Sequence, residues 1–385
     1  MPTDHEKYMA LALRLAQKGR GEVEPNPMVG ALIVKNNRII SQGWHKQFGG
    51  PHAEIIALNA AGPSARGATL YVTLEPCAHF GKTPPCANAI IRAGIRHVVI
   101  ATHDPFPLVH GKGIKKLKAA KIKVTEGVLA PEALRLNAPY FKRILAGMPW
   151  VIAKWAMTLD GKIAARTGDS RGISSKAALA YAHDLRAKVD AVIVGINTVL
   201  RDNPLLTIRH WTRKNADPAD YQPARIVLDS RCRLPLHCKI AETARWADTI
   251  VAVSKPAPRA KIDRLAKLGI EVMRFGSSES RVDILALLHY LGAKRNFTNV
   301  LIEGGAEVLA DAFEKNIVDE VRVIIAPKIL AGRSAVTAVG GAGIAKIADA
   351  IPLADMKISR LGPDTLLAAL VSNPLHHKDT KTRRI

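Results

Sequence analysis

A short stretch with one histidine, one glutamate and two cysteines constrains this chain more than any other part. These residues are His52, Glu54, Cys77 and Cys86. One imidazole and two thiolates fill three corners of a zinc tetrahedron and leave the fourth for water, as in catalytic zinc sites. Glu54 lies two residues after the histidine, where a carboxylate can take a proton from that water and pass it to a leaving group. The pattern predicts a hydrolytic zinc centre.

A closed structural zinc site is the alternative interpretation. It needs a fourth nitrogen or sulfur ligand, which His79 could supply. That arrangement leaves Glu54 without a role, so the catalytic interpretation is favoured.

Length and composition indicate a globular enzyme of two domains. The chain has 385 residues, of which 48% are hydrophobic and 23% charged. Its apolar runs are shorter than the ~20 residues that span a bilayer, so we expect no membrane insertion. Residues 1–18 mix charges on a helical pattern and lack the apolar centre of a signal peptide, which predicts a cytoplasmic protein.

The formal net charge of +23 would attract polyanions such as nucleic acids, phosphorylated metabolites and dinucleotides. Lysine and arginine are scattered and not interleaved with aromatic residues, so specific nucleic-acid binding is the less favoured interpretation. The remaining cysteines, Cys232 and Cys238, are interpreted as unrelated thiols because no histidine pattern surrounds them.

Hydrophobic periodicity predicts alternating strands and helices up to residue 145. We expect helices at residues 8–16, 52–61, 86–93, 114–120 and 131–145, and strands at residues 29–34, 38–44, 68–74, 98–101 and 122–125. Such alternation implies a sheet covered by helices. His52 and Glu54 then lie in the first turn of one helix, and Cys86 begins the next, where the helix N-terminus favours a thiolate.

A domain boundary is expected near Gly147, which gives domains at residues 1–147 and 148–372. Residues 373–385 are basic and poor in apolar side chains, which predicts a disordered tail. The second domain shows a new α/β pattern, with strands expected at residues 150–157, 191–194, 225–228, 249–253, 300–302 and 321–325.

The zinc residues stand within a longer set of motifs. Zinc deaminases usually place two residues between their cysteines, whereas eight separate Cys77 from Cys86. With this spacing, Pro-Asn-Pro-x-Val-Gly (residues 25–30), Gly-x-His (43–45), Pro-His-Ala-Glu (51–54) and the Thr-Leu-Glu-Pro-Cys segment (73–86) resemble one family. It is the bifunctional deaminase-reductase of riboflavin biosynthesis. The resemblance implies a cytidine-deaminase-like three-layer α/β/α domain that acts on a pyrimidine ribotide.

The resemblance also implies roles for single residues of the first domain. The zinc ligands are His52, Cys77 and Cys86, and the proton carrier is Glu54. The implied substrate contacts are Asn26, His45, His79 and Lys82.

The second domain has no Gly-x-Gly-x-x-Gly after a strand, so a classical dinucleotide-binding fold is not expected. Residues 154–161, 195–204, 303–305 and 326–328 instead resemble the reductase half of the same family, whose fold is similar to dihydrofolate reductase. The resemblance implies an α/β domain in which NADPH reduces a ribosylamino group to a ribitylamino group.

The implied reductase site falls into three groups. The resemblance implies catalytic roles for Lys154, Asp202 and Glu303. The residues alone do not identify which of them donates the proton. Contacts with NADPH fall on Ala156, Gly172, Thr198, Asp202, Gly304 and Gly305. Contacts with the substrate fall on Ser170, Arg186, Leu206, Arg209 and Glu303, where an arginine suits a phosphate.

Two positions depart from the family pattern. Phe106 replaces an amide that could reach the substrate, and Gly172 stands where a tryptophan is usual.

Two other functions are weighed against the favoured one. They are a nucleic-acid deaminase, motivated by the charge, and a zinc-stabilised binding protein in which Glu54 is idle. Two small-molecule sites in α/β domains also favour a homo-oligomer.

Overall fold

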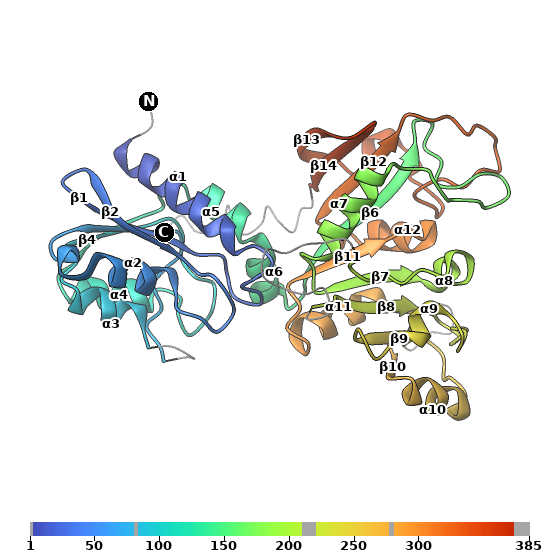
Figure 1. Ribbon diagram of the computed structural model, residues 1–385, viewed down its shortest axis with the longest axis horizontal. Coiled ribbons are helices and arrows are strands. Elements are labelled where there is room, and N and C mark those ends of the chain that lie inside the picture. Colours follow the sequence, from blue (N-terminus) through green and yellow to red (C-terminus); the bar gives the residue numbers. More distant parts are fainter. Residues whose placement is uncertain (1–2, 81–83, 210–220, 277–280, 373–385) are drawn as a thin grey trace. The chain divides into compact units, whose positions relative to one another are not determined.

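The computed structural model describes residues 3–80, 84–209, 221–276 and 281–372. The chain divides into two compact units, Met1–Met148 and Pro149–Ile385, each described by itself (Figure 1). The tail expected at residues 373–385 lies outside the described residues. Within the described ranges, no helix is both long and apolar enough to cross a bilayer.

Five strands form the sheet of the first unit, in the order β2-β1-β3-β4-β5. β1 is antiparallel to β2 and β3, whereas β3, β4 and β5 run parallel. The strands are β1 (Gly30–Lys35), β2 (Arg38–Trp44), β3 (Thr69–Val72), β4 (His97–Ile100) and β5 (Lys123–Glu126). The helices are α1 (Asp4–Ala16), η1 (Gln17–Gly19), α2 (Ala53–Ala61), η2 (Gly62–Ala65), α3 (Cys86–Arg92), α4 (Lys112–Ala119), α5 (Ala130–Leu136) and α6 (Ala138–Ala146).

Helices cover both faces of this sheet because successive strand residues point to opposite sides. On β1, Ala31 and Ile33 pack into an apolar cluster with residues of α2, α3 and α4. Leu32 and Val34 pack on the other face with residues of α1 and α5. Figure 1 shows these two groups of helices on opposite sides of the strands. The unit therefore has the three-layer α/β/α arrangement that the resemblance implies.

The prediction of a single helix at residues 131–145 is wrong, because the chain forms two helices, α5 and α6, that are separated at Asn137. The backbone of Asn137 has φ −104° and ψ 18°. Its buried side chain accepts a hydrogen bond from the N–H of Met28 at 2.8 Å and donates one to the carbonyl of Met28 at 2.9 Å. Pro139 follows in the first turn of α6, where proline is tolerated. A contact distant in sequence thus overrides the local helical pattern.

Nine strands form the sheet of the second unit, in the order β10-β9-β8-β7-β11-β6-β12-β14-β13. Neighbours from β10 to β12 are parallel, and β14 and β13 continue the sheet in antiparallel pairs. The strands are β6 (Trp150–Thr158), β7 (Ala191–Gly195), β8 (Ala224–Leu228), β9 (Thr249–Val253), β10 (Ile270–Arg274), β11 (Asn299–Glu303), β12 (Glu320–Ala326), β13 (Leu353–Leu361) and β14 (Asp364–Val371).

The helices of the second unit connect these strands. They are α7 (Lys176–Arg186), α8 (Ile196–Asp202), α9 (Lys239–Glu242), α10 (Arg259–Lys267), α11 (Ile284–Ala293), α12 (Ala306–Glu314) and η3 (Ile347–Asp349). β10, β13 and β14 are absent from the sequence-based strands. β10 and β13 are the two edge strands and carry exposed residues, so their sequences lack the apolar run of a buried strand. β14 has no exposed residue and an apolar sequence, and the sequence analysis missed it.

The central parallel strands position the functional residues of this unit. Every residue of β7 and of β9 is buried, as in a sheet covered on both faces. β7 ends at Gly195 and β11 ends at Glu303, so both carboxyl ends lie at one edge of the sheet. Ligands of open parallel sheets bind outside this edge.

Replacing Asn137 by alanine tests the contact that separates α5 from α6. The variant leaves the backbone N–H and carbonyl of Met28 without their partner, and each buried unsatisfied group costs about 1–3 kcal/mol. We expect the free energy of unfolding to fall by about 2–4 kcal/mol in denaturant titrations. Glu132→Ala, at an exposed position of α5, is the control and should change it by less than about 0.5 kcal/mol. Equal losses in both variants would contradict this account.

Candidate zinc and reductase sites

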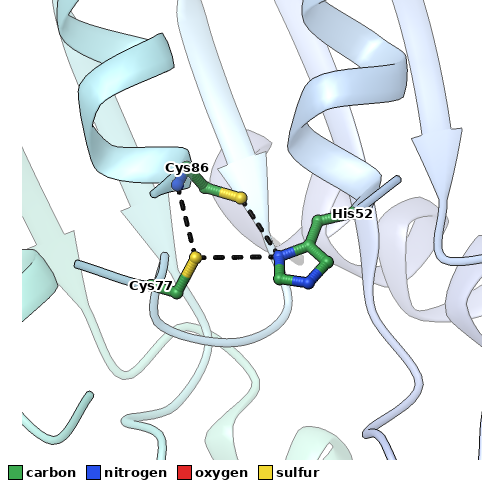
Figure 2. A group of neighbouring side chains, drawn as sticks. All are labelled: His52, Cys77 and Cys86. Carbon is green, nitrogen blue, oxygen red and sulfur yellow. Dashed lines mark hydrogen bonds between the residues drawn. The ribbon is translucent and has the colours of Figure 1, made fainter. Parts of the chain in front are cut away.

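The zinc donors of the first unit come from two helix starts and the loop between them. His52 directly precedes α2, Cys86 is the first residue of α3, and Cys77 lies in the loop after β3. His52 Nδ1 is 3.2 Å from Cys86 Sγ and 3.7 Å from Cys77 Sγ. Figure 2 shows this ring nitrogen facing both sulfurs. The side chains therefore converge on one point.

The donor set fits a zinc ion. Zinc bonds of about 2.3 Å to sulfur and 2.0–2.1 Å to nitrogen place tetrahedral nitrogen and sulfur ligands roughly 3.6 Å apart. The two distances from His52 Nδ1 lie on either side of this value, and the three donor atoms lie within 4.8 Å of one another. This is the one group of three or more possible metal ligands among the described residues. The three residues would hold zinc and leave its fourth position free.

The two thiols interact with each other, and their pKa values shift in opposite directions. A hydrogen bond with Cys86 lowers the pKa of the Cys77 thiol, although burial opposes it. The same interaction and burial raise the pKa of Cys86. The backbone N–H of Cys86, at the start of α3, donates to Cys77 Sγ at 3.3 Å. The helix end therefore stabilises charge on the cysteine across from it.

Glu54 lies in the first turn of α2 and is 3% exposed. Burial raises the pKa of its carboxyl group, and the neighbouring His52 partly opposes that rise. A carboxyl group with a raised pKa holds a proton more readily than an exposed carboxyl group does. The buried position beside the zinc donors suits the predicted proton carrier.

The second unit brings Lys154, Arg186 and Glu303 together. Lys154 on β6 is paired in register with Glu303 on the parallel strand β11. Arg186 at the end of α7 donates from Nε and Nη2 to the two carboxylate oxygens of Glu303, both at 2.7 Å. The side chains of Arg186 and Glu303 are 12% and 9% exposed. They form a buried bidentate ion pair next to the lysine.

These contacts shift the acid–base properties of the pair and of the lysine. Burial alone would raise the pKa of Glu303, but the charges of Arg186 and Lys154 lower it to about 2. Burial lowers the pKa of Lys154. Glu303 is thus held as a carboxylate, whereas Lys154 gives up its proton more readily than an exposed lysine.

Comparisons with known proteins cover both units. The family model described as the cytidine and deoxycytidylate deaminase zinc-binding region matches residues 2–102. The model described as the RibD C-terminal domain matches residues 149–367. Riboflavin biosynthesis protein RibD of Aquifex aeolicus (strain VF5) is 43% identical over 363 residues, which are 94% of this chain and 97% of the relative. The chain belongs to the RibD family.

Solved structures of this family agree with the fold. Acinetobacter baumannii RibD, form 1, has a TM-score of 0.83 at 36% identity over 96% of this chain and 99% of its own. A diaminohydroxyphosphoribosylaminopyrimidine deaminase/5-amino-6-(5-phosphoribosylamino)uracil reductase from Thermotoga maritima has a TM-score of 0.79 at 34% identity, with the same coverage. The chain is a bifunctional deaminase and reductase of riboflavin biosynthesis, which confirms the predicted fold class, enzyme class and zinc site.

Two of the family's deaminase contacts bind each other in this structure. His45 is 2% exposed, and its Nδ1 lies 3.1 Å from the carbonyl oxygen of Pro51. A carbonyl can only accept, so Nδ1 bears the proton and Nε2 accepts from Asn26 Nδ2 at 3.2 Å. Burial also lowers the pKa of His45. His45 is therefore a neutral ring that orients the amide of Asn26.

The other predicted deaminase contacts lie around an aromatic pair. The rings of His79 and Phe106 are 5.9 Å apart and tilted by 54°. His79 Nδ1 is buried and has no hydrogen-bond partner among the described residues. Phe106, which replaces the usual amide, thus stands beside a polar atom that is left for a ligand. Lys82 lies outside the described residues, and its contact stays a prediction.

Sequence reasoning missed one buried acid near the zinc donors. Asp104 follows β4 and is 7% exposed. Burial raises the pKa of its carboxyl group to about 6, although hydrogen bonds from the N–H of Phe106 and the hydroxyl of Tyr140 oppose the rise. Asp104 lies two residues before Phe106, in the segment that departs from the family pattern. Nothing in the sequence indicates that its side chain is buried.

Ser170 and Asp202, both assigned to the reducing site, lie together. Ser170 Oγ is 3.3 Å from an oxygen of Asp202 at the end of α8.

Gly172 accepts a hydrogen bond from Lys328 through its carbonyl group. Its φ of +72° is one that side chains with a Cβ rarely adopt, which explains why a tryptophan does not suit this backbone.

The loop after α8 places the two remaining predicted substrate contacts. Leu206 is 2% exposed and has φ +57°. Arg209 is exposed, and its backbone N–H donates to His183 Nδ1 at 3.3 Å. Arg186 also donates to the carbonyl of Thr207 at 3.1 Å. The guanidinium of Arg186 is thus engaged by protein groups, and its predicted contact with the substrate phosphate stays a prediction.

Three of the predicted NADPH contacts, Thr198, Gly304 and Gly305, follow the carboxyl ends of β7 and β11. Gly304 and Gly305 have φ +80° and +88°, which only glycine adopts readily. A Cβ on Gly305 would lie 3.5 Å from Thr198 Oγ1, so these two positions adjoin. Ala156, on β6, packs instead beside the apolar cluster of Ala178, Ile324 and Leu366. The three residues Thr198, Gly304 and Gly305 form one backbone-lined corner.

Glu303→Gln tests the buried ion pair through its pH dependence. The folded-state pKa of about 2 lies below the ordinary 4.5, so ionised Glu303 stabilises the fold fully above about pH 4.5. That stabilisation, on the order of 3 kcal/mol, disappears as the pH falls through about 2. We expect the difference in unfolding free energy between wild type and variant to shrink over this range in denaturant titrations. Glu271→Gln, whose carboxylate is half exposed, should show little difference throughout.

Proposed function

We propose that the first unit hydrolytically deaminates 2,5-diamino-6-(5-phosphoribosylamino)pyrimidin-4-one and that the second reduces the ribosyl group of the product to ribityl with NADPH. The observation behind this proposal is the zinc-donor set of His52, Cys77 and Cys86 beside a buried Glu54. Three donors with a proton carrier suit hydrolysis at an amino-bearing carbon, whereas a structural site uses four.

Each residue of the deaminase site has a distinct role in the proposed reaction. Zinc, when bound, supplies the Lewis acid that activates water. Glu54 moves protons from the water to the departing ammonia. The neutral His45 fixes the amide of Asn26, which then reads the pyrimidine edge. His79 offers its unpartnered nitrogen to a polar group of the substrate, and Lys82 adds a charge for its phosphate.

The reductase step joins a hydride and a proton to an imine. Opening of the sugar ring gives a carbon–nitrogen double bond. NADPH, held by Thr198, Gly304 and Gly305, would supply the hydride for the carbon of this bond and be oxidised to NADP⁺, and the protein must supply a proton to the nitrogen. We assign the proton to Lys154, because Glu303 is held ionised by Arg186 and Asp202 is exposed beside Ser170. Glu303 then keeps Lys154 charged and oriented.

NADPH and the substrate share the carboxyl edge of the parallel strands. The corner of Thr198, Gly304 and Gly305 lets backbone amides approach a phosphate. Ala156, Gly172 and Asp202 complete the proposed cofactor contacts. Ser170, Arg186, Leu206, Arg209 and Glu303 complete those with the substrate.

We place the enzyme in the cytoplasm because its zinc site needs reduced thiols. All four cysteines are free thiols in the structure. Cytoplasmic thiols stay reduced, and a thiolate is the form that binds zinc.

We also propose a homo-oligomer formed through β13. This strand is the outermost of its sheet, and almost all of its residues are exposed. Met356 and Ile358, on one face of β13, are 59% and 66% exposed. A long edge strand with exposed apolar side chains pairs readily with another chain, and a second copy offers the same edge.

Single-site variants separate the two activities. Glu54→Gln should lower deamination about 10²–10⁴-fold because the proton carrier is lost, and it should spare NADPH oxidation with the deaminated ribotide. Lys154→Met should do the reverse. Product analysis with and without NADPH measures both steps, and zinc content should stay near wild type because neither residue is a ligand.

Two outcomes would contradict the proposed function. Release of ammonia from RNA, with the diaminopyrimidine ribotide unchanged, would favour the nucleic-acid deaminase that the net charge suggests. Loss of both activities in Glu54→Gln, with zinc bound and the fold intact, would contradict two independent sites.

The double variant Met356→Lys/Ile358→Lys tests the β13 interface. Two added charges on an apolar pairing face should shift the protein to monomers in size-exclusion chromatography with light scattering. Ser359→Lys, on the other face of the strand, is the control and should leave the oligomer intact. A wild-type protein that is monomeric at all concentrations would overturn the proposal.

A further inference from the structure

The carboxylate of Glu75 is bound to the first turn of α4. Its side chain is fully buried. One oxygen accepts hydrogen bonds from the backbone N–H groups of Gly113 at 3.0 Å and Ile114 at 3.3 Å, and the other accepts from Gly111 at 3.0 Å. His103 Nδ1 is 3.6 Å from the second oxygen. A carboxylate that satisfies three otherwise unpaired helix N–H groups holds its own backbone firmly against that helix.

The next residue, Pro76, is in close contact with the same turn. A Cβ on Gly113 would lie 1.9 Å from the carbonyl oxygen of Pro76, so only glycine permits this approach. Gly113 is buried, and its φ is not in the left-handed region, so the close contact is what requires glycine here. Glu75 and Pro76 are thus fixed on α4 by two independent contacts.

Cys77 follows at once and is held from its other side by α3. Its carbonyl oxygen accepts from the N–H of Ala87 at 3.1 Å, and its Sγ accepts from the N–H of Cys86 at 3.3 Å. The position of this sulfur relative to His52 therefore depends on the spacing between the starts of α3 and α4. The loop between β3 and Cys77 also has two backbone hydrogen bonds to other parts of the unit, from the N–H of Thr73 to the carbonyl of Gly30 at 3.1 Å and from the N–H of Glu75 to the carbonyl of Thr102 at 3.0 Å.

We infer that Glu75 and Gly113 are positioning residues for the zinc site, which set the place of the Cys77 thiolate through the first turn of α4. This inference rests on the zinc site described above. Neither residue contacts the donor atoms of His52 or Cys86 in the described contacts. Their effect is on how well the three donors are arranged before zinc arrives. Partners behind metal ligands typically change metal affinity about 10–100-fold.

The test measures zinc binding by the full-length chain, not its activity. Glu75→Gln places an amide NH₂ against backbone N–H groups, and Gly113→Ala forces Pro76 away. Zinc affinity is measured by chelator competition, and the Co²⁺-substituted protein reports ligand geometry through its absorption bands. We expect each variant to lose about 10–100-fold in zinc affinity and to show altered Co²⁺ bands. Lys115→Ala, at an exposed position of α4, should bind zinc as the wild type does.

Several measurements separate positioning from general destabilisation. Amide exchange of Gly113 and Ile114 reports the state of the α4 turn, and NADPH oxidation with deaminated ribotide reports the intact second site. Unchanged zinc affinity and Co²⁺ bands in both variants would overturn the inference. Faster exchange at α4 with unchanged zinc affinity would also overturn it, because Glu75 would then only cap the helix. If Glu75→Gln does not fold, the same zinc and Co²⁺ measurements are made on Glu75→Asp. Its shorter side chain keeps the charge but pulls the loop towards α4, so the same loss of zinc affinity is expected. The zinc affinity and the Co²⁺ bands do not depend on which ribotide is deaminated, so the inference can fail while the proposed function stands.

Discussion

The first unit depends on bringing one imidazole nitrogen and two sulfurs to a common point. Two helix starts and one loop provide them, and none of these elements could place all three alone. The N–H at the start of α3 stabilises negative charge on Cys77, while burial raises the pKa of the Glu54 carboxyl group. Metal binding and proton transfer are therefore both consequences of where the helices begin.

The proposed site of the second unit depends on an ion pair and a neighbouring lysine. A lysine whose pKa is lowered by burial lies next to a carboxylate that an arginine holds ionised. Removing Arg186 would leave Glu303 to neutralise itself, and removing Glu303 would leave two buried cations. The parallel strands β6 and β11 set this arrangement, because their register places Lys154 directly beside Glu303.

Several details of both units follow from contacts that no local pattern contains. Residues 131–145 do have a helical pattern of apolar residues. The helix is nevertheless interrupted at Asn137, whose side chain bonds the backbone of Met28, more than a hundred positions away. α1 begins earlier than the apolar pattern suggests because Thr3 and Glu6 form a capping box, which the sequence does display. β13 has few buried side chains, so no hydrophobic alternation marks it. These differences arise where polar or edge contacts, not burial, decide the backbone.

The sequence by itself determined the chemistry of this protein. Residue types, spacing and family motifs identified the zinc ligands, the two α/β halves and the family, and they predicted Glu54 as the proton carrier, because metal coordination needs particular groups in a particular order. Only the tertiary structure decided how those groups are charged and held. It showed that the N–H of Cys86 donates to Cys77 Sγ, that the ring of His45 bonds the amide of Asn26, and that Glu303 is occupied by Arg186. Protonation depends on burial and on neighbours distant in the chain, and both exist only after folding.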